Sequence, residues 1–356
     1  MTWSFERFPL LSALSLGAGI TMSCSDAGTS VGPVGVGSAS ADSTDFVRRC
    51  SGPGVIKCVG FDNPEDFNYG RGRTASTVGE PHGLLPAEWP RREWRAVQDQ
   101  GVKSSGAGSL RFTIPSRSGA NTSGSYFTNF SNDLSVQFDE GQDFYLQWRQ
   151  RFSRALIETR YAGGGGFKQL IVGSGDQSGK SYSSCSPLEI VVQNYEQRGF
   201  PVLYNSCTGS ASHGPYDGFY EPFGNDFKFQ NARPEPGCRY YQKPDKLLPP
   251  AGNCFGYAGD EWMTFQLHVS PGRRVGDEFV GSRVRFWVAR ERRPSELVVD
   301  WGPYNLTAGD PATRQRFGKV WLLPYNTGKS ADQEHPEAYT WYDELIVSRQ
   351  RIADPR

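Results

Sequence analysis

Three short segments of this sequence carry polar side chains in alternation with apolar ones, and the polar types suit an acidic sugar. The polar rows are Tyr145, Gln147, Arg149 and Arg151; Thr264, Gln266 and His268; and Arg283, Arg285 and Trp287. Guanidinium groups bind carboxylate or sulfate through paired hydrogen bonds, amides bind hydroxyls, and aromatic rings stack on sugar faces. A groove lined by these rows would bind an acidic polysaccharide. The same rows would also suit a solvated sheet surface, and the sequence leaves both interpretations open.

The segments that carry these rows read as half-buried β-strands, because successive side chains of a strand leave opposite faces. In 262–269 the apolar face would consist of Met263, Phe265, Leu267 and Val269. Further strands are predicted at 109–114, 143–152, 167–172, 188–194, 201–204, 284–289, 319–325 and 341–348. Many short strands between turn signals, with almost no helical periodicity, predict an all-β, single-domain jelly-roll sandwich.

Charge balance argues against a polyanion held by the field of the whole molecule. The 356-residue chain has 38 Lys+Arg and 38 Asp+Glu. We therefore expect no nucleic-acid partner. We also expect a monomer that contacts a membrane only through a possible lipid anchor. The 42 Gly and 24 Pro, with 13% aromatic residues, suit a turn-rich β protein.

The amino-terminal segment is predicted to be a targeting segment. Residues 1–24 read as a signal peptide with an apolar core from Phe8 to Met22 and a candidate lipobox before Cys24, the lipidation site. Residues 25–44 are rich in Gly, Ser, Ala and Val and read as a flexible tether, which leaves 45–356 as the jelly-roll domain. We expect an exported bacterial protein, either a cell-envelope lipoprotein or secreted.

Six further cysteines suggest disulfides in an exported chain. Neighbours in sequence order would pair as Cys50–Cys58, Cys185–Cys207 and Cys238–Cys254. A zinc site is disfavoured, because the sequence contains no Cys-x-x-Cys pair and its histidines are scattered. Between the strands, residues 208–259 form a long irregular segment that would be either a lid or wall of the site or a surface insertion.

Five segments together resemble the concanavalin A-like jelly rolls of polysaccharide lyases, of the alginate-lyase and heparin-lyase I types. They are 167–172, 189–193, 261–269, 284–288 and 339–347, and Gln266-Leu267-His268 resembles the Gln-Ile-His motif of alginate lyases. The resemblance implies β-elimination across C4–C5 of a uronic acid in an acidic polysaccharide. That reaction needs a group that neutralises the sugar carboxylate, a base for the C5 proton and an acid for O4.

The resemblance also implies roles for individual residues. His268 would be the base and Tyr325 the acid, while Gln169, Arg149 or Asn194 would hold the carboxylate. The remaining candidate substrate contacts are Gln147, Arg151, Lys168, Gln266, Arg285, Trp287, Lys329 and Tyr342. No cofactor is required, and Asp62 with Asp343 would hold a structural Ca²⁺, as in related jelly rolls.

Two other functions fit the same fold. A non-catalytic, lectin-like surface lipoprotein would use the same groove and tether without a base, and a structural envelope protein would bind no glycan. A retaining glycoside hydrolase is disfavoured, because Glu189 lacks a second carboxylate on its strand. A Ser-His-Asp hydrolase is disfavoured by the absence of a Gly-x-Ser-x-Gly motif.

Overall fold

The fold is known from a computed structural model, which describes residues 41–67, 80–82, 96–120, 122–163, 166–194, 201–206, 256–326 and 328–356. All of these residues belong to one compact unit, Ala39–Arg356. The predicted signal peptide with Cys24, most of the tether, and nearly all of the long segment 208–259 lie outside the described residues.

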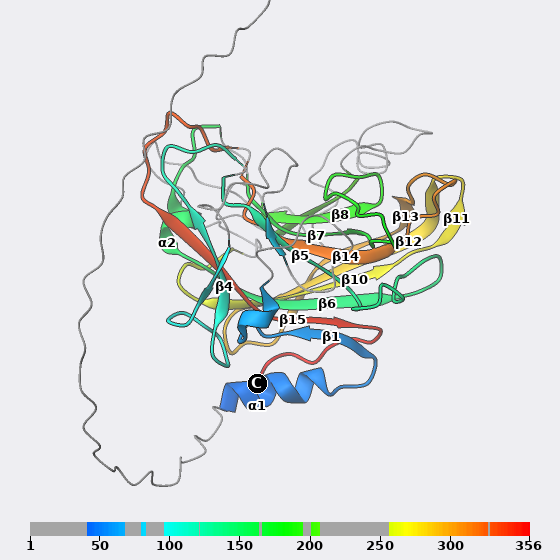
Figure 1. Ribbon diagram of the computed structural model, residues 1–356, viewed down its shortest axis with the longest axis horizontal. Coiled ribbons are helices and arrows are strands. Elements are labelled where there is room, and N and C mark those ends of the chain that lie inside the picture. The colour runs from blue at the N-terminus through cyan, green and yellow to red at the C-terminus, as the bar shows by residue number, and fades with distance from the viewer. Residues whose placement is uncertain are drawn as a thin grey trace, which may run out of the picture. The chain divides into compact units, whose positions relative to one another are not determined.

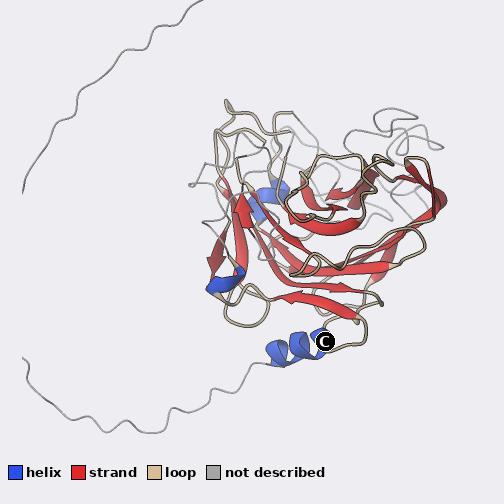
Figure 2. Ribbon diagram, turned by 45° about the vertical axis from the view of Figure 1, so that its right-hand side comes forward, coloured by secondary structure: helices blue, strands red, loops and turns tan. Residues whose placement is uncertain are grey.

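Two antiparallel sheets form the unit, and Figures 1 and 2 show them stacked as two layers. Sheet A contains β1 (Val55–Val59), β3 (Val97–Asp99), β4 (Ser109–Ile114), β6 (Phe144–Phe152), β10 (Trp262–Ser270), β11 (Arg273–Val275), β12 (Glu278–Ala289), β13 (Glu296–Thr307) and β15 (Ala338–Ser348). Sheet B contains β2 (Glu80–His82), β5 (Ser125–Asn129), β7 (Lys168–Ser174), β8 (Glu189–Asn194), β9 (Pro201–Asn205) and β14 (Phe317–Leu322). The predicted all-β jelly-roll sandwich is confirmed.

The core lies between the two sheets and is rich in aromatic rings. Met263, Phe265, Leu267 and Val269 of β10 are all fully buried, as their alternation predicts. Rings from the two sheets meet directly: the centroids of Phe144 in β6 and Phe317 in β14 lie 5.4 Å apart. Burial of such rings removes large apolar areas from water and stabilises the sandwich.

Helices are few among the described residues. They are α1 (Ala41–Cys50), α2 (Arg154–Glu158) and the 3₁₀ turn η1 (Pro64–Asp66). No helix in this part of the chain is both long and apolar enough to cross a bilayer. Helix α1 begins within the predicted tether, and ion pairs from Asp45 to Arg48 and Arg49 within the helix stabilise it.

Helix α1 is fastened to sheet A on the side away from sheet B (Figure 1). The buried Arg49 forms an ion pair with Glu344 of β15 and donates to Gln147 Oε1 of β6 at 2.8 Å. The Cys50–Cys58 disulfide joins the end of the helix to β1, as predicted. Cys185 is also disulfide-bonded, whereas Cys207, Cys238 and Cys254 lie outside the described residues.

Candidate active site

The face of sheet B that points away from sheet A carries a lysine and a glutamate whose pKa values are shifted by burial. In the strand register Ile171 of β7 pairs with Val191 of β8 and with Trp321 of β14, and Val191 pairs with Tyr204 of β9. Directly paired residues point to the same side of a sheet. We call this side, away from sheet A, the sheet B outer face.

Lys168 opens β7 at the end of this face. Its Nζ lies 4.9 Å from the centroid of the Tyr325 ring and 5.5 Å from that of Tyr204. Its backbone N–H donates to the Tyr325 carbonyl oxygen at 2.7 Å, which holds the two residues side by side. Burial lowers the pKa of Lys168, because the charged ammonium loses hydration. The residue as a whole is half-buried.

Glu189, the first residue of β8, carries a carboxylate whose charge interacts with that of Lys168. Its side chain is 1% exposed, its Oε2 accepts from the Ser186 N–H at 3.2 Å, and its Oε1 has no hydrogen-bond partner among the described residues. Burial raises the pKa of Glu189, and the Lys168 charge opposes that rise. Burial therefore favours the neutral forms of both Lys168 and Glu189.

This arrangement can supply a base and an acid. A lysine with a lowered pKa has a larger neutral fraction near pH 7 and can accept a proton. The Tyr325 hydroxyl can donate a proton, and the ring that carries it contacts the Lys168 amine. The sequence predicts Lys168 only as a substrate contact and indicates no catalytic role for Glu189 or Tyr204. Their shared face follows from the strand register, which alternation within single strands does not give.

Gln169, the neighbour of Lys168, points the other way into the space between the sheets. The pairing of β7 with β8 shifts by one residue between Lys168 and Leu170, so Gln169 occupies a bulge. Gln169 Nε2 donates to Gln150 Oε1 at 3.0 Å, and the Tyr257 hydroxyl donates to Gln169 Oε1. Its amide is thus part of a buried hydrogen-bond network and does not share a surface with Lys168.

Asn194 and Tyr342 are also buried. Asn194 Oδ1 accepts from the Phe167 N–H at 3.0 Å. The Tyr342 hydroxyl donates to the Gln169 carbonyl oxygen at 2.8 Å across the two sheets, and burial holds its pKa well above the usual range. Lys329 donates to the Pro115 carbonyl oxygen at 2.9 Å and to Ser118 Oγ at 2.5 Å, and burial lowers its pKa to about 8.

His268 lies on the opposite side of the sandwich, on the face of sheet A that points away from sheet B. Its ring stacks on Tyr145 with centroids 4.3 Å apart, and its Nε2 lies 2.9 Å from Asp143 Oδ2. Burial lowers the pKa of His268, although Asp143 opposes the shift. Both sheets separate His268 from Tyr325, so the structure does not bring the expected base and acid together.

The three polar rows do share this outer face of sheet A. Gln266 pairs with Gln147 and Trp287, and His268 pairs with Tyr145 and Arg285. The middle of the face is covered by the chain end: Gln266 Nε2 donates to the Ile352 carbonyl oxygen at 3.1 Å, and Gln147 Nε2 to that of Ala353 at 3.0 Å. These amides therefore bind backbone and form neither a solvated surface nor the floor of a cleft.

The charged members of the rows have protein partners as well. Arg285 Nε lies 3.3 Å from Asp300 Oδ1, and the Arg351 guanidinium lies 4.8 Å from the centroid of the Trp287 ring. Arg149 lies 3.7 Å from Glu344 Oε1 and 4.0 Å from Glu291 Oε1. Arg151 pairs with Trp262 in the register, and its Nε is buried without a hydrogen-bond partner among the described residues.

Asp62 and Asp343 do not fit a calcium site. Asp62 Oδ1 accepts from the N–H groups of Ala107 and Gly108, and Asp343 accepts from those of Ser104 and Glu344. Oxygens that face amide hydrogens are poorly placed for a cation. Within the described ranges there is also no cluster of three or more His, Cys, Asp or Glu side chains that could hold a metal.

No protein-family model and no curated protein matches this chain. Similar solved structures include the PL-14 alginate lyase from Aplysia kurodai, at 12% identity and a TM-score of 0.41, covering 82% of this chain and 98% of the lyase. Alginate lyase vAL-1 from Chlorella virus has 12% identity and a TM-score of 0.36, with 72% and 90% covered. Cellulose induced protein Cip1 has 12% identity and a TM-score of 0.38, with 73% and 87% covered. Likeness at these scores carries no argument about the chemistry of this chain.

Proposed function

We propose that this protein cleaves an acidic polysaccharide by β-elimination on the sheet B outer face. The observation that carries the proposal is the contact of the Lys168 amine with the Tyr325 and Tyr204 rings, on a face where the charge of the buried Glu189 also acts on the lysine. Neutral Lys168 would take the C5 proton of a uronic acid residue, and the Tyr325 hydroxyl would protonate the departing O4. The C4–O4 bond breaks, and a C4=C5 double bond forms.

Lys168 replaces His268 as the base in this proposal. His268 Nε2 is directed at Asp143, and the imidazole is covered by the Tyr145 ring, which leaves little room for a sugar. Lys168 is half-buried as a residue, and its amine contacts the ring of a tyrosine whose hydroxyl can act as acid. A base and an acid must reach the same sugar residue, and this requirement favours the lysine.

The test is absorbance near 235 nm while the purified protein meets alginate, glucuronan, pectate, heparin, hyaluronan and ulvan in turn. Rising absorbance reports the unsaturated ends that β-elimination leaves. Lys168→Ala and Tyr325→Phe should each reduce the initial rate by about a hundredfold or more, as loss of a positioned base or acid does. His268→Ala is the matched control and should keep most of the rate.

Three results would contradict the proposal. A flat trace on every polysaccharide with glycan binding retained would favour the lectin-like function. Loss of the rate in His268→Ala but not in Lys168→Ala would return the base to the outer face of sheet A. A rate that survives both Lys168→Ala and Tyr325→Phe would move the chemistry to another part of the chain.

A further inference from the structure

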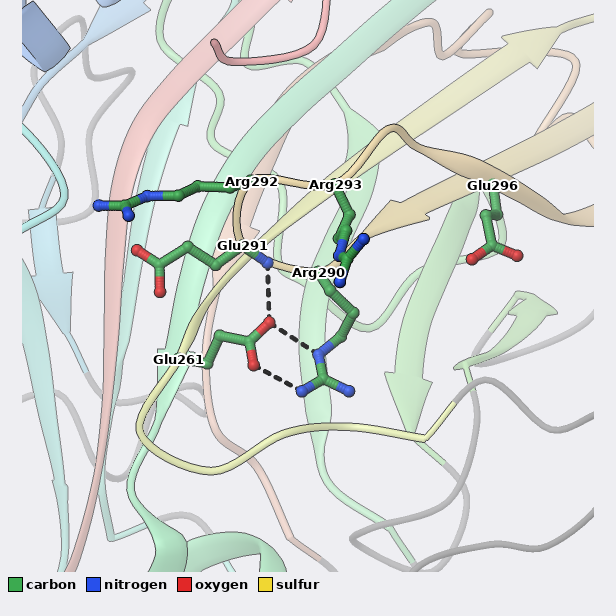
Figure 3. A pocket seen from close by; sticks show the side chains of 6 residues that line it. All are labelled: Glu261, Arg290, Glu291, Arg292, Arg293 and Glu296. Carbon is green, nitrogen blue, oxygen red and sulfur yellow. Dashed lines mark hydrogen bonds and ion pairs between the residues drawn. The ribbon is translucent and has the colours of Figure 1, made fainter.

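A second charged region lies at the turn between β12 and β13, on the sheet A side of the sandwich. The turn consists of Arg290 to Arg293, and the Arg293 N–H donates to the Arg290 carbonyl oxygen at 3.0 Å. It borders an open hollow of about 800 Å³, which is lined by Glu261, Arg290, Glu291, Arg292, Arg293 and Glu296 (Figure 3). We call this the arginine hollow.

Glu261 holds the turn in place. Its carboxylate accepts from Arg290 Nε at 2.7 Å and Nη2 at 2.5 Å, and its Oε1 also accepts from the Glu291 N–H at 2.7 Å (Figure 3). A two-point guanidinium–carboxylate pair fixes orientation as well as distance. The rim of the hollow is therefore organised before any ligand arrives.

Two arginines of the turn are left for a ligand. Arg292 and Arg293 are exposed, and neither forms a side-chain hydrogen bond or ion pair with any described residue. Arg292 extends to the side of the turn away from the Glu261 pair, while Arg293 lies above Arg290 (Figure 3). Arg292 has a φ of 56°, in the left-handed region that non-glycine residues seldom adopt.

A smaller hollow continues the site across the turn toward sheet A. It has a volume of about 50 Å³ and shares Arg290 to Arg293 with the first, adding Arg149 and Arg356. Arg149 is only partly neutralised, since its two carboxylate neighbours lie at 3.7 and 4.0 Å and its Nε is buried without a hydrogen-bond partner in the described part of the chain. Together the two hollows are lined by five arginine and three glutamate side chains, an excess of positive charge.

We propose that the arginine hollow binds the carboxylate or sulfate groups of an acidic polysaccharide at a non-catalytic site. A volume of about 800 Å³ exceeds what one small anion fills and falls in the usual range for larger ligands. Guanidinium forks suit planar carboxylate and sulfate groups, and the arginines are spread over both sides of the turn. The sheet B outer face lies on the other side of the sandwich, so the hollow would hold polymer without using the proposed base and acid.

The experiment compares the mobility of the full chain in native gels that contain pectate, heparin or neutral dextran. The double variant Arg292→Glu with Arg293→Glu should weaken the retardation by pectate or heparin about tenfold in apparent affinity. Dextran should have no effect. The matched control, Arg117→Glu with Arg273→Glu, changes net charge equally and should bind as the unchanged protein does. Arg273 is exposed on β11, at the other end of β12 from the turn.

Three other results would contradict polysaccharide binding at the arginine hollow. Equal loss in both double variants would show that net charge alone controls binding. Equal retardation of both double variants and the unchanged protein would show that the hollow is not used. A fourth gel contains duplex DNA, and stronger retardation there than by pectate or heparin would assign the hollow to nucleic acid.

Two additions keep folding and catalysis separate from binding. Arg292→Gln with Arg293→Gln, which only removes charge, should give an intermediate affinity with an unchanged thermal midpoint. Lys168→Ala should keep full retardation, so that loss of lyase activity and loss of binding at the hollow are distinguished.

Discussion

The Nζ atom of Lys168 lies 4.9 Å from the centroid of the Tyr325 ring, and the same lysine donates its backbone N–H to the Tyr325 carbonyl oxygen. The first residue of β7 and the segment that follows β14 thus place an amine and an aromatic ring side by side. The electron-rich ring stabilises the ammonium form, while burial stabilises the neutral amine. Burial lowers the pKa of Lys168, and the charge of Glu189 opposes this shift.

Replacing Lys168 by arginine separates a base from a fixed positive charge. Arginine keeps the charge that would neutralise a sugar carboxylate, but it cannot release a proton near neutral pH. We expect Lys168→Arg to lose at least about a hundredfold in initial rate while it still binds the polysaccharide. Absorbance near 235 nm and a binding assay on the same preparation check this. A rate close to that of the unchanged protein would make Lys168 an electrostatic contact and not the base.

Glu189 should set the pH at which Lys168 becomes active. The Glu189 charge raises the pKa of Lys168, so Glu189→Gln should lower it further. Activity depends on the neutral amine and rises as pH passes the lysine pKa. The rising limb of the pH–rate profile should therefore move to lower pH in Glu189→Gln.

Glu334→Gln is the control, because it removes an exposed charge that is paired with Arg117. Its profile should be unchanged. An unmoved limb in Glu189→Gln would mean that Glu189 carries no charge near Lys168 during turnover.

The strands and the core face could be predicted from the sequence, whereas the site could be predicted only in part. Alternation assigns Phe265 and Leu267 to the core and Gln266 and His268 to the other side, because the pleat allows nothing else. It does not indicate that residues 352–353 cover the middle of that other side through Gln147 and Gln266. Those contacts join segments far apart in the chain and leave no periodic pattern.

The bulge in β7 is the second feature without a sequence signal. The family resemblance places Gln169 among the carboxylate-binding residues. The one-residue shift in the pairing of β7 with β8 instead directs its amide to Gln150, between the two sheets. Lys168 remains on the sheet B outer face opposite Gln193. A single added residue thus decides which of two adjacent polar side chains is available for chemistry.

The buried ion pair of Arg49 with Glu344 should be a major determinant of stability at the α1 contact. Both side chains are 1% exposed. Removing one partner leaves a buried charge with only its second contact, Arg49 with Asp45 or Glu344 with Arg149. Arg49→Met or Glu344→Gln should therefore each lower the free energy of unfolding by about 3 kcal/mol, the lower end of the range for a broken buried pair. The double variant should lose less than the sum of the two. Urea unfolding monitored by tryptophan fluorescence measures all three.

The exposed pair of Arg117 and Glu334 provides the comparison, with side chains 66% and 75% exposed. Its single variants should change the free energy of unfolding by about 1 kcal/mol or less. Similar losses for both pairs would contradict a special role for the Arg49 contact. Strict additivity in the Arg49 and Glu344 cycle would contradict direct coupling between them.

Two lysines outside the proposed site should make stability depend on pH above neutrality. Burial lowers the pKa of Lys57 and of Lys329 to about 8 from 10.5. Between these values the unfolded chain binds more protons than the folded protein, so the free energy of unfolding rises with pH from about 8 to about 10.5. Below about pH 8 both the folded and the unfolded state hold the proton, and the free-energy cost of burying each charged lysine is present in full.

Lys329→Met should therefore flatten part of this rise in the free energy of unfolding, as measured by urea unfolding curves from pH 7 to pH 10. Lys103→Met, which alters an exposed lysine, is the control and should leave the slope of the free energy of unfolding against pH unchanged. If Lys329→Met has the same slope as the unchanged protein, Lys329 has the same pKa in the folded and unfolded states, which contradicts the prediction.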